Sequence, residues 1–425
     1  MSAGFCLRGA AVLGPTGTFE GPIDVAVEDG VVTAVGQAAP SDAPSVDASG
    51  LFVMPGMVEC HDHLTMSTVD LAECLTTPAT ELVLRAARNA RVTLEGGVTF
   101  VRDLAGLDRG IRDGFARGYV PAPRIQTSIV MLSQTGGHGD SFLAGPGIEA
   151  SALMIGYPGR PPIVVDGVDA MRKAVRELLR GGADWIKVAA TGGLVSDHDQ
   201  PLVAEFTTEE LEAAAFEGRR KGKPLAAHAY GGEGLTNAVL AGARSIEHGG
   251  FLTEEQATLM AERGCWLVPT LAAMRDCIRF AEEGLLTPTQ CEKVLGFGLE
   301  LGACVMLAKE HGVRLASGTD YISSRQHGRN LEELSLLRKA GLTAAEALLA
   351  GTAWGADLCG VGDRIGRIAP GFRFDAIVLD ADPGDLSCFE QPGAVAGVFK
   401  EGAVVLPHPQ LAGQGLVPPA PELPA

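Results

Sequence analysis

The sequence predicts an α/β protein with a (β/α)8 TIM barrel and a small β-sandwich-like domain built from both chain ends. Three observations support this fold class. The middle of the chain alternates eight β-rich runs with amphipathic helical stretches, and repeated β-α units imply a parallel sheet. Both chain ends are instead rich in β-forming residues and glycine turns. The 425 residues also exceed the roughly 250 that a barrel needs, which leaves room for a second unit.

The small β-domain is predicted to combine residues 1–55 with residues 362–410. The first segment contains VAVEDGVVTAVG, in which an Asp-Gly pair between two β-rich runs predicts a hairpin. The second segment contains AVAGVFKEGAVVL, which again has two β-rich runs around a glycine. We therefore expect both chain ends to meet in one domain beside the barrel. Residues 411–425 are rich in proline, so we expect an extended or disordered tail.

The barrel is predicted to occupy residues 56–361. Open doubly wound sheets also alternate strands and helices, but they usually have fewer strands, so eight runs favour a closed barrel. The helical stretch DAMRKAVRELLRGGA closes with glycines, and TTEELEAAAFEGRRKG opens with threonine and glutamates, as helix ends do. The candidate strands are 57–63, 98–103, 124–130, 184–190, 224–229, 244–248, 265–270 and 313–319.

Reactive side chains fall at the ends of these predicted strands, where a (β/α)8 barrel carries its active site. Four of the nine histidines of the chain lie there. His61 and His63 are two residues apart in a strand, so they point to the same side. Because imidazole is a common metal ligand, the pattern favours a metal site over two surface histidines. The residues concerned are His61 and His63 (strand 1), Lys187 (strand 4), His228 (strand 5), His248 (strand 6) and Asp320 (strand 8).

Lys187 lies inside the apolar strand DWIKVAA, where a charged ammonium is costly to bury. One interpretation is a structural ion pair with Asp184 or Asp103. The other is chemical: a lysine that desolvation and metal charge keep neutral can take up carbon dioxide as a carbamate. A carbamate has two oxygens and can bridge two cations.

The pattern His-x-His, Lys, His, His and Asp resembles that of the binuclear amidohydrolase superfamily, over nearly the whole chain. The resemblance implies two divalent metal ions, zinc before manganese or cobalt, and a bridging hydroxide that attacks a carbonyl carbon. It also implies that Asp320 passes the proton of this hydroxide to the leaving amine. The implied ligands are His61, His63 and Asp320 for one ion, His228 and His248 for the other, and carboxylated Lys187 between them.

The stretches GGVTFVRDL, QTGGHGD, DWIKVAATGG, HAYGG, SIEHGG and GTD...HGRNLEEL are similar to those of the prolidase-like and Xaa-Arg/Xaa-Lys dipeptidase group. This likeness implies cleavage of an amide bond in a small dipeptide or N-acyl amino acid. It also implies that Tyr230 and His138 act at the substrate carbonyl or carboxylate; without it they would be a core or rim aromatic and a loop histidine. His327 could line the pocket or cap a helix. Arg325 or Arg329 could pair with a substrate carboxylate.

Other functions compete with this one. The same metal pair could hydrolyse another small amide, a carbamate, a lactone or an ester. A mononuclear deaminase of an aminated heterocycle typically lacks the strand 4 lysine and carries a glutamate where this chain has Gly231. A scaffold that has lost its ligands is a third class, but every expected ligand is present. Lys187 and Gly231 together favour amide hydrolysis.

Composition restricts the partners and the location. The net charge of −18 argues against nucleic acid and anionic membranes as partners. The sequence has no apolar run of about 18 residues and a poor secretory signal, so we expect a cytoplasmic protein that acts on a small molecule. The nine cysteines form no C-x-x-C pair, and we expect them to be small buried residues. The family resemblance implies a homo-oligomer.

Overall fold

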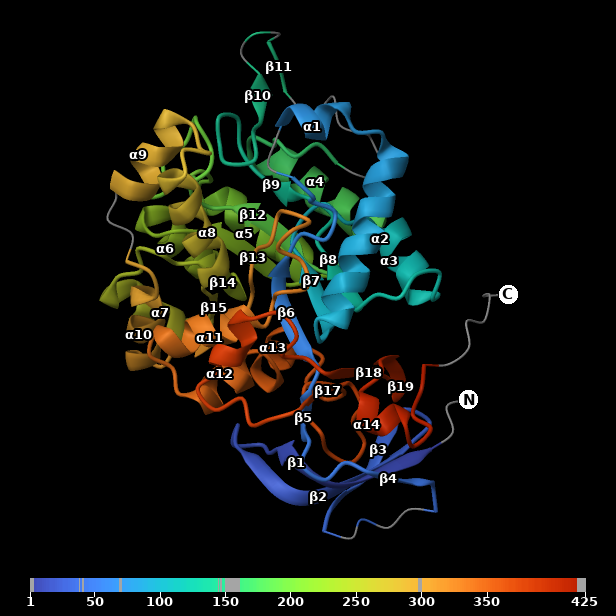
Figure 1. The fold of residues 1–425 in the computed structure, drawn as a ribbon. Coiled ribbons are helices and arrows are strands. Elements are labelled where there is room, and N and C mark those ends of the chain that lie inside the picture. The colour runs from blue at the N-terminus through green and yellow to red at the C-terminus, as the bar shows by residue number, and fades with distance from the viewer. Residues whose placement is uncertain are drawn as a thin grey trace.

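The computed structural model describes residues 4–37, 39, 42–68, 71–143, 145, 147–149, 161–296 and 300–418. The fold is mixed α/β, and Figure 1 shows two regions. Parallel strands surrounded by helices form the upper region of that view. A sheet that combines the blue N-terminal and red C-terminal strands forms the lower region.

The two chain ends share one eight-stranded sheet in the order β19-β18-β17-β5-β1-β2-β3, with β4 paired to β1. β17 runs antiparallel to β5 and thereby joins the ends, as predicted. The sandwich-like layering of this region stays a prediction. The strands are β1 (Phe5–Leu13), β2 (Phe19–Glu28), β3 (Val31–Gly36), β4 (Ser45–Asp47), β5 (Phe52–Pro55), β17 (Ala376–Leu379), β18 (Gly397–Lys400) and β19 (Ala403–Leu406).

The predicted hairpin is the connection between β2 and β3. Asp29 and Gly30 both have positive φ, 48° and 76°, as the central residues of a type I′ turn must. Gly30 also packs against the backbone of Glu401 so closely that a Cβ would overlap its carbonyl. The turn therefore connects the N-terminal hairpin to the C-terminal strands.

The middle of the chain forms two parallel sheets, β6-β7-β8 and β16-β15-β14-β13-β12-β9. Their edges are connected by backbone hydrogen bonds: Cys60 N–H donates to Ser317 O (3.0 Å), and Asp320 N–H donates to His61 O (2.6 Å). The strands are β6 (Met57–Asp62), β7 (Val98–Asp103), β8 (Arg124–Thr127), β9 (Met131–Leu132), β12 (Ile186–Ala189), β13 (Leu225–Ala229), β14 (Ser245–His248), β15 (Trp266–Val268) and β16 (Arg314–Leu315).

The prediction of one continuous strand over residues 124–130 was wrong. β8 ends at Thr127, Ile129 has a φ of 69°, and β9 pairs with β12 in the other sheet. A residue with positive φ cannot continue an extended strand, so the third run of the alternation is broken. The strand predicted at 313–319 is also shorter, because regular pairing covers only Arg314–Leu315.

Both helices with predicted end signals are present. α5 begins after Thr207, whose hydroxyl accepts a hydrogen bond from Glu210 N–H while Glu210 bonds back in a capping box. α4 ends at Gly181 and is capped by Gly182, which has a φ of 91°. Further elements are β10 (Phe142–Leu143), β11 (Ile148–Glu149), η2 (Ser387–Glu390) and the helices α1 (Leu71–Thr76), α2 (Ala79–Glu95), α3 (Arg109–Ala116), α4 (Val168–Gly181), α5 (Thr208–Arg219), α6 (Gly232–Ala241), α7 (Glu254–Arg263), α8 (Leu271–Glu282), α9 (Pro288–Gly296), α10 (Ala303–Glu310), α11 (Glu332–Lys339), α12 (Ala344–Ala350), α13 (Ala353–Leu358) and α14 (Pro409–Ala412).

The predicted tail begins inside α14, and its residues 419–425 lie outside the described residues. Among the helices of the described ranges, none combines the length and apolar character that crossing a bilayer requires.

The described cysteines are free thiols. Cys60 turns away from the histidine face, and its sulfur lies 3.9 Å from that of Cys359. The interior of the parallel sheets is unusual for its charge, because it buries acidic, basic and imidazole side chains together.

Candidate active site

Five of the six predicted metal ligands lie at or just after the carboxyl ends of the parallel strands, and Lys187 lies within β12. The strand register places Ala189 beside His228 and Ala229 beside His248. Five of the six residues are buried, and the side chain of Asp320 is 21% exposed. They are His61 in β6, His63 directly after it, Lys187 in β12, His228 in β13, His248 at the end of β14, and Asp320 after β16.

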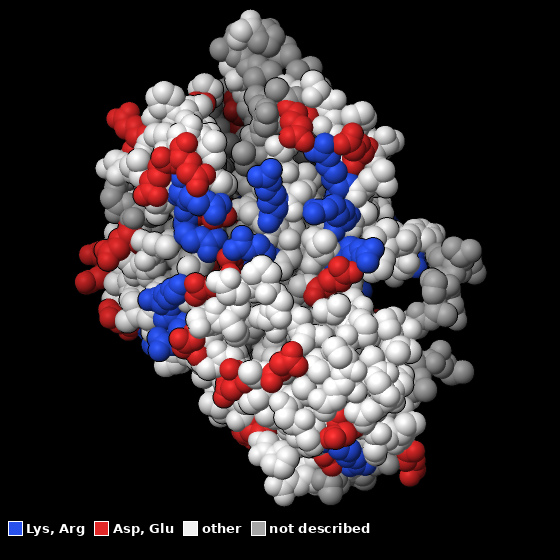
Figure 2. Space-filling model, in the orientation of Figure 1, with Lys and Arg blue, Asp and Glu red and all other residues white. Residues whose placement is uncertain are grey.

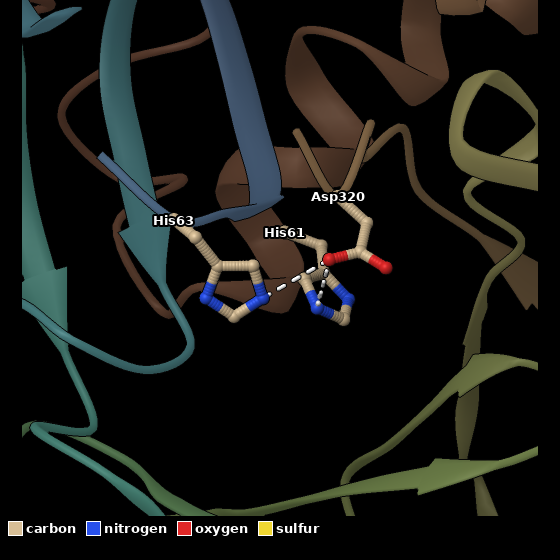
Figure 3. Close-up of side chains that lie close together, drawn as sticks. All are labelled: His61, His63 and Asp320. Carbon is tan, nitrogen blue, oxygen red and sulfur yellow. Dashed lines mark ion pairs between the residues drawn. The ribbon is translucent and has the colours of Figure 1, made fainter. Parts of the chain in front are cut away.

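His61, His63 and Asp320 form a compact cluster (Figure 3). Asp320 Oδ1 lies 3.0 Å from His63 Nε2 and 3.4 Å from His61 Nε2, while the other carboxylate oxygen points away from both rings. Burial alone would lower the pKa of His63, but the hydrogen bond and charge of Asp320 raise it to about 9. The negative potential that stabilises this imidazolium would equally favour a metal cation.

His228 and His248 form a second group. His228 Nδ1 and His248 Nε2 lie 2.8 Å apart, and the centroid of the His248 ring lies 5.3 Å from that of His61. Burial lowers the pKa of His228 well below its ordinary value and the pKa of His248 to about 4. Because neutral imidazole is the form that binds metal ions, burial keeps both rings in the ligand form.

Each of the four imidazoles has one ring nitrogen held by a neighbouring protein group. Histidines that bind a metal typically use their second nitrogen in this way, which fixes the ring and its tautomer. Of the other four nitrogens, those of His61 and His63 lie near Asp320 Oδ1, and those of His228 and His248 lie 2.8 Å apart. The held pairs are His61 Nδ1 with Glu247 Oε2 (2.9 Å), His63 Nδ1 with Ala105 O (2.9 Å), His228 Nε2 with Gly192 O (3.2 Å) and His248 Nδ1 with Thr270 Oγ1 (2.7 Å).

Lys187 is fully buried beside these groups. In the described part of the chain its Nζ has no hydrogen-bond partner, although Glu247 and Asp320 act on its charge. Burial lowers the pKa of Lys187 to about 8. The alternative of an ion pair with Asp184 or Asp103 is wrong. Asp184 pairs with Arg112 and Lys223, and Asp103 accepts backbone N–H groups of Leu64 and Leu107.

Backbone strain is concentrated at this end of the strands. His248, Thr270 and Asp320 have φ values of 76°, 50° and 56°. Side chains other than glycine rarely adopt this region, and such residues cluster at functional sites. Two of the three are candidate ligands, and the third holds His248.

Sequence reasoning missed a buried ion pair behind His61. Glu247 accepts two hydrogen bonds from Arg102 Nη2, both 2.9 Å, and Arg102 stacks on the ring of Trp185 at 4.5 Å. Glu247 in turn fixes His61. A signal was available for Arg102, a charged residue in the largely apolar run VTFVRD, as Lys187 is in its own strand.

Replacing Arg102 by methionine is expected to lower the free energy of unfolding by about 3–5 kcal/mol, because it leaves a buried carboxylate without its cation. Denaturant-induced unfolding of the metal-free protein checks this. Arg91→Met is the matched control, since Arg91 pairs with Glu95 on an exposed helix surface and should cost less than about 1 kcal/mol. Equal unfolding midpoints for the two variants would contradict the assigned importance of this pair.

Asp62, between the two paired histidines, belongs to a buried network that joins β6 to the segment after β16. Asn330 Nδ2 donates to Asp62 Oδ2 (3.2 Å) and to Glu59 Oε2 (3.0 Å). His327, a predicted substrate residue, is buried behind this network. Its Nδ1 lies 3.4 Å from Asp62 Oδ1, and its Nε2 lies 3.1 Å from Met66 O. These surroundings favour a structural role, in which His327 supports the segment that carries His61 and His63. A role for His327 in substrate binding stays a prediction.

The other predicted substrate residues lie in different surroundings. His138 stacks on His228, with ring centroids 4.2 Å apart, and Tyr230 stacks on His248 at 5.0 Å. Both rings therefore lie directly against candidate ligands. Arg325 is exposed in the loop after β16, whereas Arg329 pairs with Glu332. The roles of all four stay predictions.

Comparison with known proteins places this geometry in a family. Residues 52–405 match the model of the amidohydrolase family. The ochratoxinase of Aspergillus niger is 34% identical over 364 residues, which cover 82% of this chain and 75% of that protein. The chain therefore belongs to the amidohydrolase family, as its strand-end pattern predicted.

Solved structures of two further relatives are similar over 94% of this chain and 99% of theirs. One is a prolidase in complex with N-methylphosphonate-L-proline, with a TM-score of 0.85 and 30% identity. The other is a Xaa-Pro dipeptidase with methionine bound in its active site, with a TM-score of 0.85 and 27% identity. The predicted likeness to the prolidase-like group is confirmed, and these neighbours imply a TIM-barrel domain.

Proposed function

We propose that this chain is a metal-dependent amidohydrolase that cleaves the amide bond of a small dipeptide or N-acyl amino acid. The observation that carries the proposal is the orientation of four buried imidazoles. Each is held by one nitrogen; the other nitrogen lies against Asp320 in His61 and His63, and the other nitrogens of His228 and His248 lie 2.8 Å apart. The likeness to a prolidase, a Xaa-Pro dipeptidase and an ochratoxinase supports an amide-type substrate.

The residues fit two divalent cations, with zinc favoured because imidazole and carboxylate are its ordinary ligands. His61, His63 and Asp320 would hold one ion, and His228 and His248 the other. Such ions lower the pKa of a shared water and polarise a carbonyl oxygen. We also propose that the two parallel sheets close into one (β/α)8 barrel. The backbone hydrogen bonds between β6 and the segment around β16 support this closure.

Lys187 fits the role of a bridging carbamate. Burial without a hydrogen-bond partner makes its ammonium costly, and a pKa of about 8 leaves a substantial fraction of the amine neutral near neutral pH. Only the neutral amine can react with carbon dioxide. Carboxylation would replace a buried cation by an anion that two metal ions can balance.

The remaining steps fall to side chains of this chain. Asp320 has one oxygen directed at the histidines and a second that points away, so it can accept a proton from the attacking water and deliver it to the leaving nitrogen. Burial raises the pKa of Tyr230 well above its ordinary value, so its phenol keeps its proton and can donate to the carbonyl oxygen. His138 would act at the substrate carbonyl or carboxylate.

Tyr230→Phe is expected to lower kcat by roughly 10²-fold with little change in KM, because a donor to the developing oxyanion is used mainly in the transition state. Steady-state kinetics on the best substrate measures this. Tyr119→Phe is the control, since Tyr119 is 58% exposed. An unchanged kcat would assign Tyr230 to packing against His248 alone.

Amino-acid release from mixed dipeptides and N-acyl amino acids, followed by mass spectrometry with the zinc-loaded protein, tests the function. Release that stops with a chelator and in His61→Asn is the expected result. Release of ammonia from aminated heterocycles would indicate the deaminase class instead, although Gly231 stands where such enzymes carry their glutamate. A protein with bound metal and no amide hydrolysis would overturn the substrate class and direct the screen to carbamates, lactones and esters.

A further inference from the structure

We propose that Asp199 and Lys293 are positioning residues that fix the imidazole of His138 through its Nδ1 and leave Nε2 for the substrate. The inference rests on the proposed function for its substrate contact. The contacts among the three side chains do not depend on that function. The side chains come from three separate segments. These are the loop after β9, the loop after β12 and helix α9.

Asp199 is the central group of this arrangement. Its Oδ2 lies 3.1 Å from His138 Nδ1 and accepts a hydrogen bond from Gly193 N–H at 2.9 Å. Its Oδ1 accepts from Lys293 Nζ at 2.8 Å and from Ser196 Oγ. Burial alone would raise the pKa of Asp199, but the hydrogen bonds and charge of His138 and Lys293 lower it well below its ordinary value. The carboxylate therefore stays ionised beside the imidazole.

Lys293 connects helix α9 to this loop. Its side chain is 2% exposed, and Nζ also donates to Gly193 O at 2.7 Å and to Asp199 O at 3.3 Å. The same face of α9 supports the loop again where Gln290 Nε2 donates to Val195 O. A buried lysine whose donors are used on one loop is a structural clamp, and Asp199 is its counter-ion.

His138 is held on its other sides as well. Its ring packs on Gly193 so closely that a Cβ there would overlap it, and it stacks on His228 at an interplanar angle of 18°. Its backbone N–H donates to Glu205, which also accepts from Ser133 Oγ at 3.0 Å. With the ring plane fixed and Nδ1 occupied, Nε2 is the nitrogen left for a substrate oxygen.

This arrangement argues against another use of the same acidic residues. Asp197, Asp199 and Glu205 together suggest a subsite for a cationic substrate side chain. However, Asp199 is already paired with Lys293, and burial raises the pKa of Glu205 to about 8. Asp197 is exposed and accepts from Thr287 Oγ1 at 2.6 Å. The two buried carboxylates therefore bind groups of the protein itself, Asp199 the Lys293 ammonium and Glu205 the His138 backbone N–H, as a positioning role requires.

A double-mutant cycle between Asp199 and His138 tests the proposal in the zinc-loaded protein. Asp199→Asn is expected to lower kcat/KM about 100-fold, as a misplaced catalytic group does, with the metal content unchanged. Asp199→Asn combined with His138→Asn should be no slower than His138→Asn alone, because both changes remove one function. Asp197→Asn and Glu292→Gln, on the same loop and the same helix, are matched controls and should keep full activity.

Nuclear magnetic resonance of ¹⁵N-histidine-labelled protein provides a readout that needs no turnover. The ring signals of His138, identified by their loss in His138→Asn, should report a bonded Nδ1–H that shifts in Asp199→Asn and in Lys293→Met. If Lys293→Met does not fold, Asp199→Asn alone decides. Unshifted His138 signals, or additive rate losses in the double mutant, would overturn the positioning role. Shifted signals in a protein without amide hydrolysis would overturn the proposed function and keep the positioning of His138.

Discussion

Replacing Asp320 by asparagine is expected to lower kcat/KM by roughly 10²- to 10⁴-fold, the loss typical of a removed general base, and to reduce the metal content. The change removes the carboxylate that lies against His61 and His63 and the proton acceptor of the proposed reaction. Asparagine keeps the size of the side chain and tolerates the left-handed backbone at this position, where φ is 56°. Initial rates and metal analysis by mass spectrometry measure both effects.

Asp363→Asn is the control for this variant, since Asp363 has a side chain that is 77% exposed and should keep full rate and metal content. Circular dichroism would show that both variants are folded. An Asp320→Asn protein with normal turnover would refute the assignment of the site. Normal metal content with lost turnover would keep Asp320 as the base and remove it from the ligands.

Lys187→Ala is expected to lose roughly 10³-fold in rate, equivalent to about 4 kcal/mol in the activation barrier, and to recover part of it with formate or acetate. A short carboxylate can enter the space left by the side chain and supply the two oxygens of the lost carbamate. Lys173→Ala, at a 73% exposed side chain, should neither lose activity nor respond to acid. The rates of both variants at increasing concentrations of formate or acetate, at constant pH, provide the measurement.

The bridging group can also be observed directly. In ¹³C-bicarbonate the native protein should show a carbamate resonance that Lys187→Ala lacks. If Lys187→Ala keeps two tightly bound metal ions without added acid, the carbamate is not needed to bridge them, and the buried amine requires another explanation.

The sequence was sufficient to predict where the candidate ligands lie but not how they are oriented. His61, His228 and His248 each lie near the end of a predicted strand, and neighbouring parallel strands bring their rings together. The nitrogen that each ring presents depends on Glu247, Gly192 and Thr270, which lie in other strands and loops. Those contacts exist only after the strands pack, so no local pattern encodes them.

Local rules also decided which parts of the fold were predicted well. The Asp29-Gly30 turn and the ends of α4 and α5 depend on a few adjacent residues, and these predictions are confirmed. The break at Ile129 is a tertiary effect, because β9 pairs with β12 while β8 pairs with β7. The hydrogen bond from Lys293 in helix α9 to Asp199 is equally non-local.

Several expectations from the sequence and from the family resemblance stay predictions. These are the domain limits, the cytoplasmic location, the homo-oligomer and the absence of nucleic acid or membrane partners. Figure 2 shows basic side chains grouped in the upper middle of the face in view, with acidic side chains around them, although the net charge is −18.

The sheet shared by both chain ends has a consequence for synthesis. β5 lies directly before the first parallel strand, yet it pairs with β17, which emerges from the ribosome more than 300 residues later. Until then, one edge of the N-terminal strands has unpaired backbone groups and can associate with other nascent chains. The terminal sheet therefore cannot be completed before β17 has been synthesised, and a protein truncated before Ala376 should aggregate even though its candidate active site is encoded in full.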